Sequence, residues 1–296
     1  MGIAVIPVPA AATGKTQKTQ EFTSTTSWTA PTGVLAVNVF LCAGGGGGGG
    51  TYGTNAFGGG GGGGEVISKM ITVVPGPSYT VTIGGGGSGA TATASVNTAG
   101  ANGSNSSFGA LLTAVGGGGG ASTSTGGGIN EGNPGSTTVS SGGGASGSSS
   151  ASNSAGGSGG GAGGPAFGAL PLRFGGSSQQ TNSTLAAEIG FAGNRGSTAT
   201  PGSDSLNFAN QKRPGPGIGD YGCGATGGFS PSLAVPQPES WRKAGRGRNV
   251  YLSNAGSGTA AEANFGGGGG GAGSTGNTSY AGGNGGSGYC LINWLE

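Results

Sequence analysis

The residue types that carry most enzyme and metal chemistry are scarce in this chain. None of the 296 residues is histidine, which excludes a Ser-His-Asp or Cys-His arrangement and any histidine metal ligand. Three cysteines, Cys42, Cys223 and Cys290, form an odd number without a Cys-x-x-Cys spacing, which argues against a disulfide framework or a zinc site. We expect buried free thiols, and a pairing of Cys42 with Cys290 stays open.

Paired carboxylates are the remaining option for hydrolysis, because glycosidases use two such groups. The candidates are Glu188, Asp204, Asp220 and Glu239, which are few enough to be surface groups. The segment RKAGRGR (242–248) has the composition of an arginine-glycine RNA-binding segment, but it occurs once. The sequence therefore predicts no enzyme, no cofactor, no metal site and no nucleic-acid partner.

Glycine dominates the composition, with 79 residues, while charged residues make up only 7% and the net charge is +2. Ordinary chains have about 7% glycine and about 25% charged residues. Disordered tails are usually highly charged, and collagen needs glycine at every third position with abundant proline. No apolar stretch reaches membrane-spanning length, and the start lacks the basic region of a signal peptide. We expect neither a signal peptide nor membrane insertion.

Strand-like segments lie near both ends of the chain. Residues 34–43 and 65–74 are rich in β-branched and apolar residues, 79–83 alternates apolar with polar residues, and 288–295 is a fourth, largely apolar strand candidate. A small sheet is marginal without a covering layer. We therefore expect a mainly β protein with irregular segments, in which both ends of the chain form a small antiparallel sheet or sandwich.

Runs of glycine separate these strands, the longest being 44–50 and 58–64. An extended helix of the polyproline II shape has three residues per turn and no internal hydrogen bonds. Its backbone groups need partners, and all-glycine neighbours can approach to about 4.8 Å to supply them. The runs predict a stacked bundle of polyglycine II-type helices, anchored by the sheet.

These elements divide the chain into several parts. Residues 1–21 are expected to be an amino-terminal docking arm, followed by a glycine-rich domain over 22–296. Within the domain we assign 22–83 and 287–296 to anchoring strands and 84–164 and 265–286 to the glycine-helix bundle. Residues 165–264 are a less glycine-rich insertion that bears loops.

The insertion is the candidate for recognition. Of the 20 charged residues, 13 lie between Arg173 and Glu262, together with several aromatic residues. Aromatic residues and arginine are enriched at binding hot spots. The contact candidates are Tyr221, Trp241, Arg242, Lys243, Arg246 and Arg248. The competing interpretation is a globular insertion with Trp241 in its core and the basic residues as a solvated face.

The segments TSTTSWTAPTGVLAVNVFLCAGGGGGGG, GGGGGGGEVISKMITVVPGPSYTVTIGGGGSG and GGSGYCLINW resemble the glycine-rich domain of bacteriophage tail fibre and tail tip proteins. They are also similar to polyglycine-sandwich phage adhesins. The resemblance covers roughly residues 22–120 and 265–296. It implies a glycine-helix stack whose loops touch the host surface, either a polysaccharide or an outer-membrane protein. This chain differs from the capping adhesins in having its own amino-terminal arm.

The resemblance also implies a place in the virion tail, after synthesis in the host cytoplasm. The arm would bind other phage tail proteins, and a homo-oligomer such as a trimer is compatible with this. Two alternatives stay open: a purely structural virion component without receptor contact, and a secreted glycine-rich surface or ice-binding protein.

Overall fold

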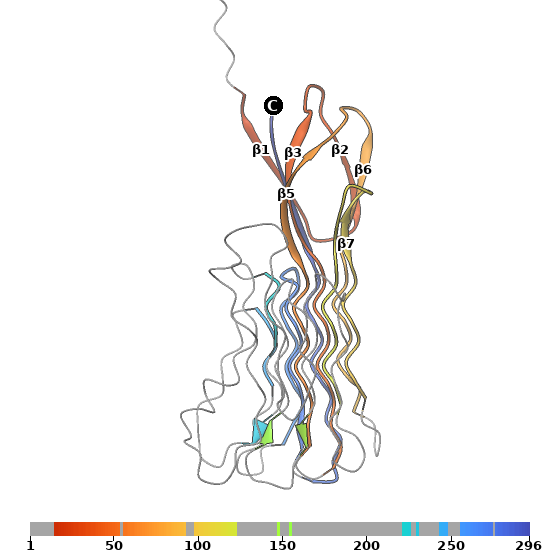
Figure 1. The fold of residues 1–296 in the computed structure, drawn as a ribbon, viewed down its shortest axis with the longest axis vertical. Coiled ribbons are helices and arrows are strands. Elements are labelled where there is room, and N and C mark those ends of the chain that lie inside the picture. Colours follow the sequence, from red (N-terminus) through yellow and green to blue (C-terminus); the bar gives the residue numbers. More distant parts are fainter. Residues whose placement is uncertain are drawn as a thin grey trace, which may run out of the picture.

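Two antiparallel sheets face each other at one end of the molecule (Figure 1). The computed structural model describes residues 15–53, 56–92, 98–122, 147–148, 154–155, 221–225, 229–230, 243–247, 255–274 and 276–296. The first sheet has the order β1-β13-β3-β5, formed by β1 (Gln17–Phe22), β13 (Tyr289–Leu295), β3 (Ala36–Cys42) and β5 (Val66–Thr72). The second has the order β2-β6-β7-β8, formed by β2 (Thr26–Thr29), β6 (Ser78–Thr82), β7 (Ser106–Phe108) and β8 (Leu112–Ala114).

Two-residue strands form two smaller sheets. One has the order β12-β4-β9 and joins β12 (Gly273–Ser274), β4 (Ala56–Phe57) and β9 (Gly147–Ser148). The other pairs β10 (Ser154–Ala155) with β11 (Phe229–Ser230). The described residues contain no helix of the α or 3-10 type, so the mainly β prediction is confirmed.

Strands from the two ends of the chain share the first sheet, as the sequence predicts. The last strand, β13, lies between β1 and β3 and pairs antiparallel with both. The amino-terminal boundary differs from the prediction, because residues 17–21 pair with β13 instead of belonging to an arm. Their polar sequence, QKTQE, is exposed and has no apolar alternation to mark a strand. Residues 1–14 lie outside the described residues.

The hydrophobic core fills the space between the two sheets. Val37, Val39 and Leu41 from β3 and Ile292 from β13 lie on the inner face of the first sheet. Side chains of the second sheet meet them, namely Trp28, Val81, Phe108, Leu112 and Ala114. Burying such side chains stabilises a protein by roughly 1.5–3 kcal/mol each. The core therefore gives the glycine segments a rigid base.

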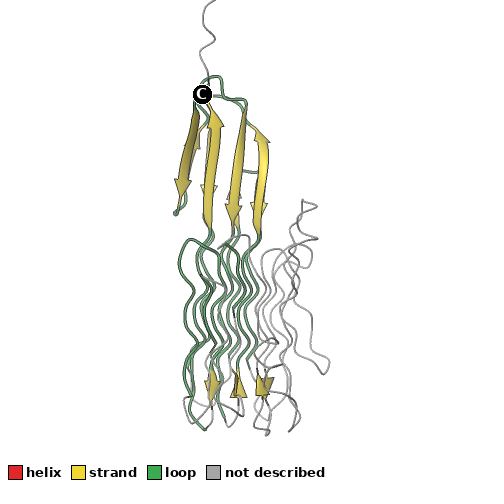
Figure 2. Cartoon of the chain, turned by 90° about the vertical axis from the view of Figure 1, so that its left-hand side faces the viewer, coloured by secondary structure: helices red, strands yellow, loops and turns green. Residues whose placement is uncertain are grey.

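Glycine-rich segments continue directly from the strands of the sandwich into the bundle (Figure 2). The run 44–50 follows β3, the run 58–64 leads into β5, and 84–90 follows β6. Segment 98–104 leads into β7, 115–121 follows β8, and 280–288 leads into β13. The sandwich therefore sets the position and direction of each segment where it enters the bundle.

The run 44–50 lies at the centre of a lattice and has six neighbours. Residues that are three apart in this run donate their backbone N–H groups to the same neighbouring segment. Donors and acceptors are Gly44, Gly47 and Gly50 to Ser104, Ala101 and Thr98; Gly45, Gly48 and Thr51 to Gly286, Gly283 and Tyr280; and Gly46 and Gly49 to Gly62 and Gly59. These N–O distances are 2.8–3.0 Å. The three acceptor segments run antiparallel to the central run.

Three further neighbours run parallel to the central run and donate to its carbonyl groups. Gly117 and Gly120 donate to Gly44 and Gly47, Gly87 and Ala90 to Gly45 and Gly48, and Gly269 and Ala272 to Gly46 and Gly49. A period of three residues in both donation and acceptance is the geometry of a polyglycine II helix. The predicted stacked bundle is therefore confirmed, and the runs 44–50 and 58–64 belong to it instead of to the anchoring strands.

Segments at the edge of the lattice have fewer glycines. In 98–104 only Gly100 and Gly103 point at a neighbouring carbonyl, those of Gly47 and Gly44, and the other positions carry alanine, asparagine, serine and threonine. Asparagine side chains satisfy donors that face outward: Asn102, Asn105 and Asn284 accept from the N–H groups of Gly119, Gly116 and Gly89 at 2.8–3.0 Å. Side-chain amides thus replace neighbouring helices where the lattice ends.

All three cysteines are buried and free. Cys42 pairs in register with Tyr289, so Cys290 points to the opposite face of the sheet, into the core. Successive side chains of a strand alternate between faces. A disulfide between Cys42 and Cys290 is therefore absent, and the expectation of buried thiols is confirmed.

The raised pKa values of two of these thiols predict that the free energy of unfolding decreases at high pH. Burial raises the pKa of the Cys290 thiol from 9.0 to about 12, and burial and the nearby Cys223 also raise the pKa of Cys42. The unfolded chain therefore loses these protons first, so the free energy of unfolding falls as pH rises above 9. At pH 10.5 we expect the Cys290 thiol to account for a loss of about 2 kcal/mol.

Denaturant titrations at pH 7 and pH 10.5 measure this effect. The Cys290→Ala variant is the matched control, because it lacks one of the ionising groups and should lose about 2 kcal/mol less between the two pH values. An equal loss in both proteins would contradict the assignment of the effect to the Cys290 thiol.

Candidate functional site

Lys243 and Arg246 form a basic row on the side of the bundle, where the segments 243–247 and 256–262 run next to each other. The N–H of Glu262 donates to the carbonyl of Lys243, and the N–H of Thr259 donates to that of Arg246, at 3.0 Å each. Lys243 and Arg246 are three residues apart, which is one turn of a polyglycine II helix, or about 9 Å. Both residues therefore lie on the same side of their segment.

The two basic side chains have different surroundings. The Lys243 ammonium lies 2.6 Å from a carboxylate oxygen of Glu262 and 4.9 Å from the centre of the Phe265 ring. Arg246 is exposed, and its backbone N–H donates to the Thr259 hydroxyl at 2.7 Å. Part of the charge of the row is thus compensated by Glu262, while the Arg246 side chain faces solvent.

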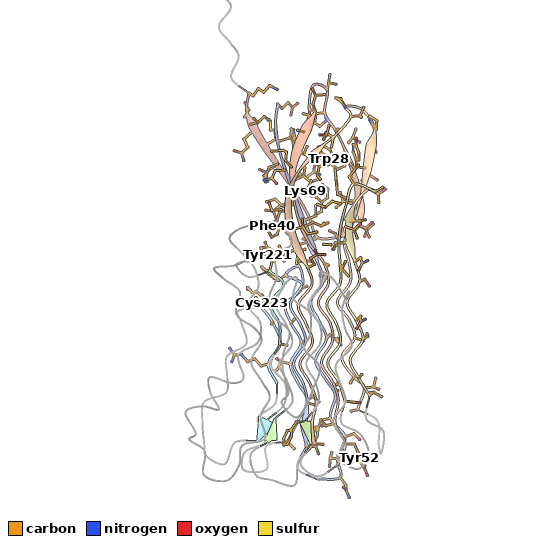
Figure 3. The ribbon with its side chains drawn as sticks, in the orientation of Figure 1. Trp28, Phe40, Tyr52, Lys69, Tyr221 and Cys223 are labelled. Carbon is orange, nitrogen blue, oxygen red and sulfur yellow. The ribbon has the colours of Figure 1, made fainter. Side chains whose placement is uncertain are left out.

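Tyr221 is a packing residue at the junction of bundle and sandwich (Figure 3). Its ring contacts Phe40, Phe265 and Tyr289, with centroid distances of 4.9, 5.2 and 5.3 Å. It covers the lower part of the outer face of the first sheet, next to the buried Cys42. The structure therefore gives Tyr221 a packing role, while part of its ring stays accessible, so its assignment as a receptor contact stays a prediction.

The described parts of the insertion 165–264 continue the lattice. The N–H of Ala225 donates to Gly61, that of Gly245 to Gly268, and that of Gly268 to Cys223. Trp241, Arg242 and Arg248 lie outside the described residues, as does most of the insertion. The structure therefore places Lys243 and Arg246 on one segment, and Lys243 and Tyr221 both contact the Phe265 ring.

Sequence reasoning missed Glu262, Thr259 and Phe265 as members of this surface. Glu262 and Phe265 are close in the chain, so the sequence places them together. Their pairing with Lys243 depends on which helices are neighbours in the lattice. The choice of which helices are adjacent in the lattice leaves no periodic pattern in the sequence.

The bundle has a second exposed region at the end opposite the sandwich, where Tyr52 lies (Figure 3). Thr51 and Tyr280 exchange two backbone hydrogen bonds there, at 3.0 and 2.9 Å. The buried ring of Phe57 and the Ser274 hydroxyl, which donates to the carbonyls of Gly276 and Thr278, order the connections. The signal for this region is TYGTN, which connects two seven-glycine runs and so must lie at one end of the bundle.

Among the described residues, no three histidine, cysteine or carboxylate groups converge as a metal site would require. The same part of the chain has no helix with the length and apolarity to cross a membrane. The chemistry available at the surface is therefore hydrogen bonding, stacking and charge pairing.

A comparison with curated proteins returned no match. A family model described as a glycine-rich domain matches residues 19–295. The match begins inside β1 and ends with the last residue of β13, so it spans nearly all of the sandwich and the glycine lattice between these strands. The chain therefore belongs to the glycine-rich domain family.

Proposed function

We propose that this chain is a bacteriophage tail fibre or tail tip protein that attaches the particle to the host cell surface. One structural observation supports the proposal most directly. The molecule is a rod with the sandwich and the described chain ends at one pole and the connections around Tyr52 at the other (Figures 1 and 3). Such a rod holds an attachment end and a contact surface apart.

The lattice favours recognition through a small part of the surface. Its central helices have backbone groups only, and these are used in hydrogen bonds between neighbours. Specific contacts must come from side chains at the edges and from segments that leave the lattice. The basic row of Lys243 and Arg246, with Trp241, Arg242 and Arg248 adjacent in sequence, offers guanidinium and aromatic groups suited to a polysaccharide or an outer-membrane protein.

The sandwich pole is proposed to hold the other tail proteins, with the residues that precede β1 as the docking arm. Residues 17–21 are part of the first sheet, so the arm in this proposal is the segment before them. If the chain is a component of the phage tail, this would also explain why its strand and glycine motifs resemble those of phage tail proteins.

Adsorption of the purified, labelled protein to host cells tests the proposal. We expect the double variant Trp241→Ala with Arg242→Ala to bind host cells at least about tenfold more weakly, which corresponds to about 1.4 kcal/mol. Its melting temperature should equal that of the wild type, because the loss is one of contacts to the receptor.

Lys69→Ala is the matched control, since Lys69 is an exposed cation on the sandwich, away from the basic row (Figure 3). A double variant that unfolds would identify Trp241 as a core residue. One that folds and binds normally would move the contact elsewhere, to the segments 129–141 or 194–208, which lie outside the described residues, or to Tyr52. Wild-type protein that does not bind cells would favour a purely structural role.

A further inference from the structure

A groove of about 440 Å³ opens at the sandwich pole, on the outer face of the first sheet. Asn38, Met70 and Asn293 line it, and these three residues are direct neighbours in the strand register of β5, β3 and β13. They therefore share one face of the sheet, opposite to the face that carries Val37 and Ile292 into the core. Val34 of the core and Trp294, which packs against the core, also line the groove, so it borders the sandwich core, and none of its lining residues belongs to the basic row.

The groove gathers exposed apolar side chains. Five large apolar side chains are exposed in the described part of the chain, and three of them line this groove: Leu35, Met70 and Leu295, with 65%, 66% and 54% of their surface accessible. Contiguous apolar surface of this kind marks an interaction site more often than scattered exposed residues do. Its volume is also in the range of pockets that bind ligands, about 300–1,000 Å³.

We propose that residues 3–9 of this same chain, Ile-Ala-Val-Ile-Pro-Val-Pro, occupy the groove. Lys15 lines the groove, so the segment that precedes it starts at the rim. Residues 10–14 are a tether of small residues, AAATG, that can reach about 17 Å when extended. The four strands of the sheet span about 14 Å, so the tether allows residues 3–9 to reach every part of the groove.

The chemistry of the segment matches that of the groove. Its side chains are all apolar, and Pro7 and Pro9 favour an extended backbone with fewer N–H groups to satisfy. A short tether keeps the segment at an effective concentration on the order of millimolar. The inference concerns the isolated chain and does not rest on the proposed function. In an assembled particle, a protein that binds the arm would first have to displace it from this groove.

Disulfide trapping in the full-length protein tests the inference. The variant pair Val5→Cys with Leu35→Cys should form an intramolecular disulfide under mild oxidation, detected by mass and by electrophoretic mobility. The native cysteines are buried, so we expect them not to react under mild oxidation. A second pair, Val5→Cys with Met70→Cys, gives an independent measurement on the other side of the groove.

The control pair is Val5→Cys with Leu111→Cys, because Leu111 is also exposed but follows β7 in the second sheet. We expect both groove pairs to react at least about tenfold faster than the control pair, and at a rate independent of protein concentration. Equal rates for all pairs would overturn the proposal, since the segment would then have no preferred site. Disulfides between two molecules would assign the groove to a second copy, and the absence of any disulfide would leave the segment outside it.

Discussion

Replacing Gly61 with valine should lower the free energy of unfolding by at least about 3 kcal/mol, the upper end of the usual cost of overpacking. A Cβ atom at Gly61 would overlap the carbonyl oxygen of Gly46 and lie 2.6 Å from its carbonyl carbon. Both atoms belong to backbone of the central run, which six neighbours hold in place. The two helices would have to separate, and their hydrogen bonds would lengthen or break.

Thermal unfolding followed by circular dichroism measures this effect. A loss of 3 kcal/mol in a chain of this size corresponds to a decrease of about 6–12 °C in melting temperature. Gly85→Val is the matched control: Gly85 belongs to the lattice segment 84–90, but a Cβ there meets no atom within 4 Å. The control should change stability by no more than about 0.5 kcal/mol. Equal melting temperatures for the two variants would contradict the close-packed lattice.

Replacing Phe108 with alanine should cost about 3–5 kcal/mol, the usual range for a fully buried aromatic residue. The Phe108 ring is completely buried and stacks on Tyr79 at a centroid distance of 5.2 Å. It also meets the Trp28 ring at 5.9 Å. The substitution leaves a cavity between these rings, at the point where the second sheet meets the bundle.

Leu111→Ala is the control for this variant. Leu111 is in the same β7–β8 hairpin, but its side chain is 46% exposed, so its truncation should cost about 1 kcal/mol or less. Guanidinium titrations of both variants separate the two effects. If Phe108→Ala lost no more stability than Leu111→Ala, the sandwich core would not be the base on which the lattice depends.

The lattice could be predicted from sequence mainly where the glycine runs are continuous. In the run 44–50, and at Gly58, Gly61, Gly63 and Gly64 of the second run, an added Cβ would lie within 3.1 Å of a neighbouring backbone atom. The edge segment 98–104, TAGANGS, needs glycine only at positions 100 and 103. Its glycine spacing of three is the signal, but it is weak among serine, threonine and alanine.

The polar strand β1 and the surface around Lys243 were harder to predict for a different reason. β1 is at the edge of its sheet and exposed, so burial imposes no pattern on its sequence. Glu262 lies beside Lys243 because two lattice segments are neighbours, and this choice depends on the whole arrangement of helices. Tyr221 was predicted as a receptor contact, and its packing could not be predicted because its aromatic partners come from β3, β13 and residue 265.

The continuous glycine runs also have a consequence for variation in chain length. Identical residues on a threefold screw axis make the same hydrogen bonds after a shift of one residue and a rotation of 120°. A run such as 44–50 therefore has no internal register, and only the strand at one end and the connection at the other fix it. Loss or gain of one glycine, the usual product of replication slippage in a repetitive gene, would move about 3.1 Å of chain into or out of the connection near Tyr52. Length variants would thus alter the shape of the pole opposite the sandwich and leave the sandwich unchanged.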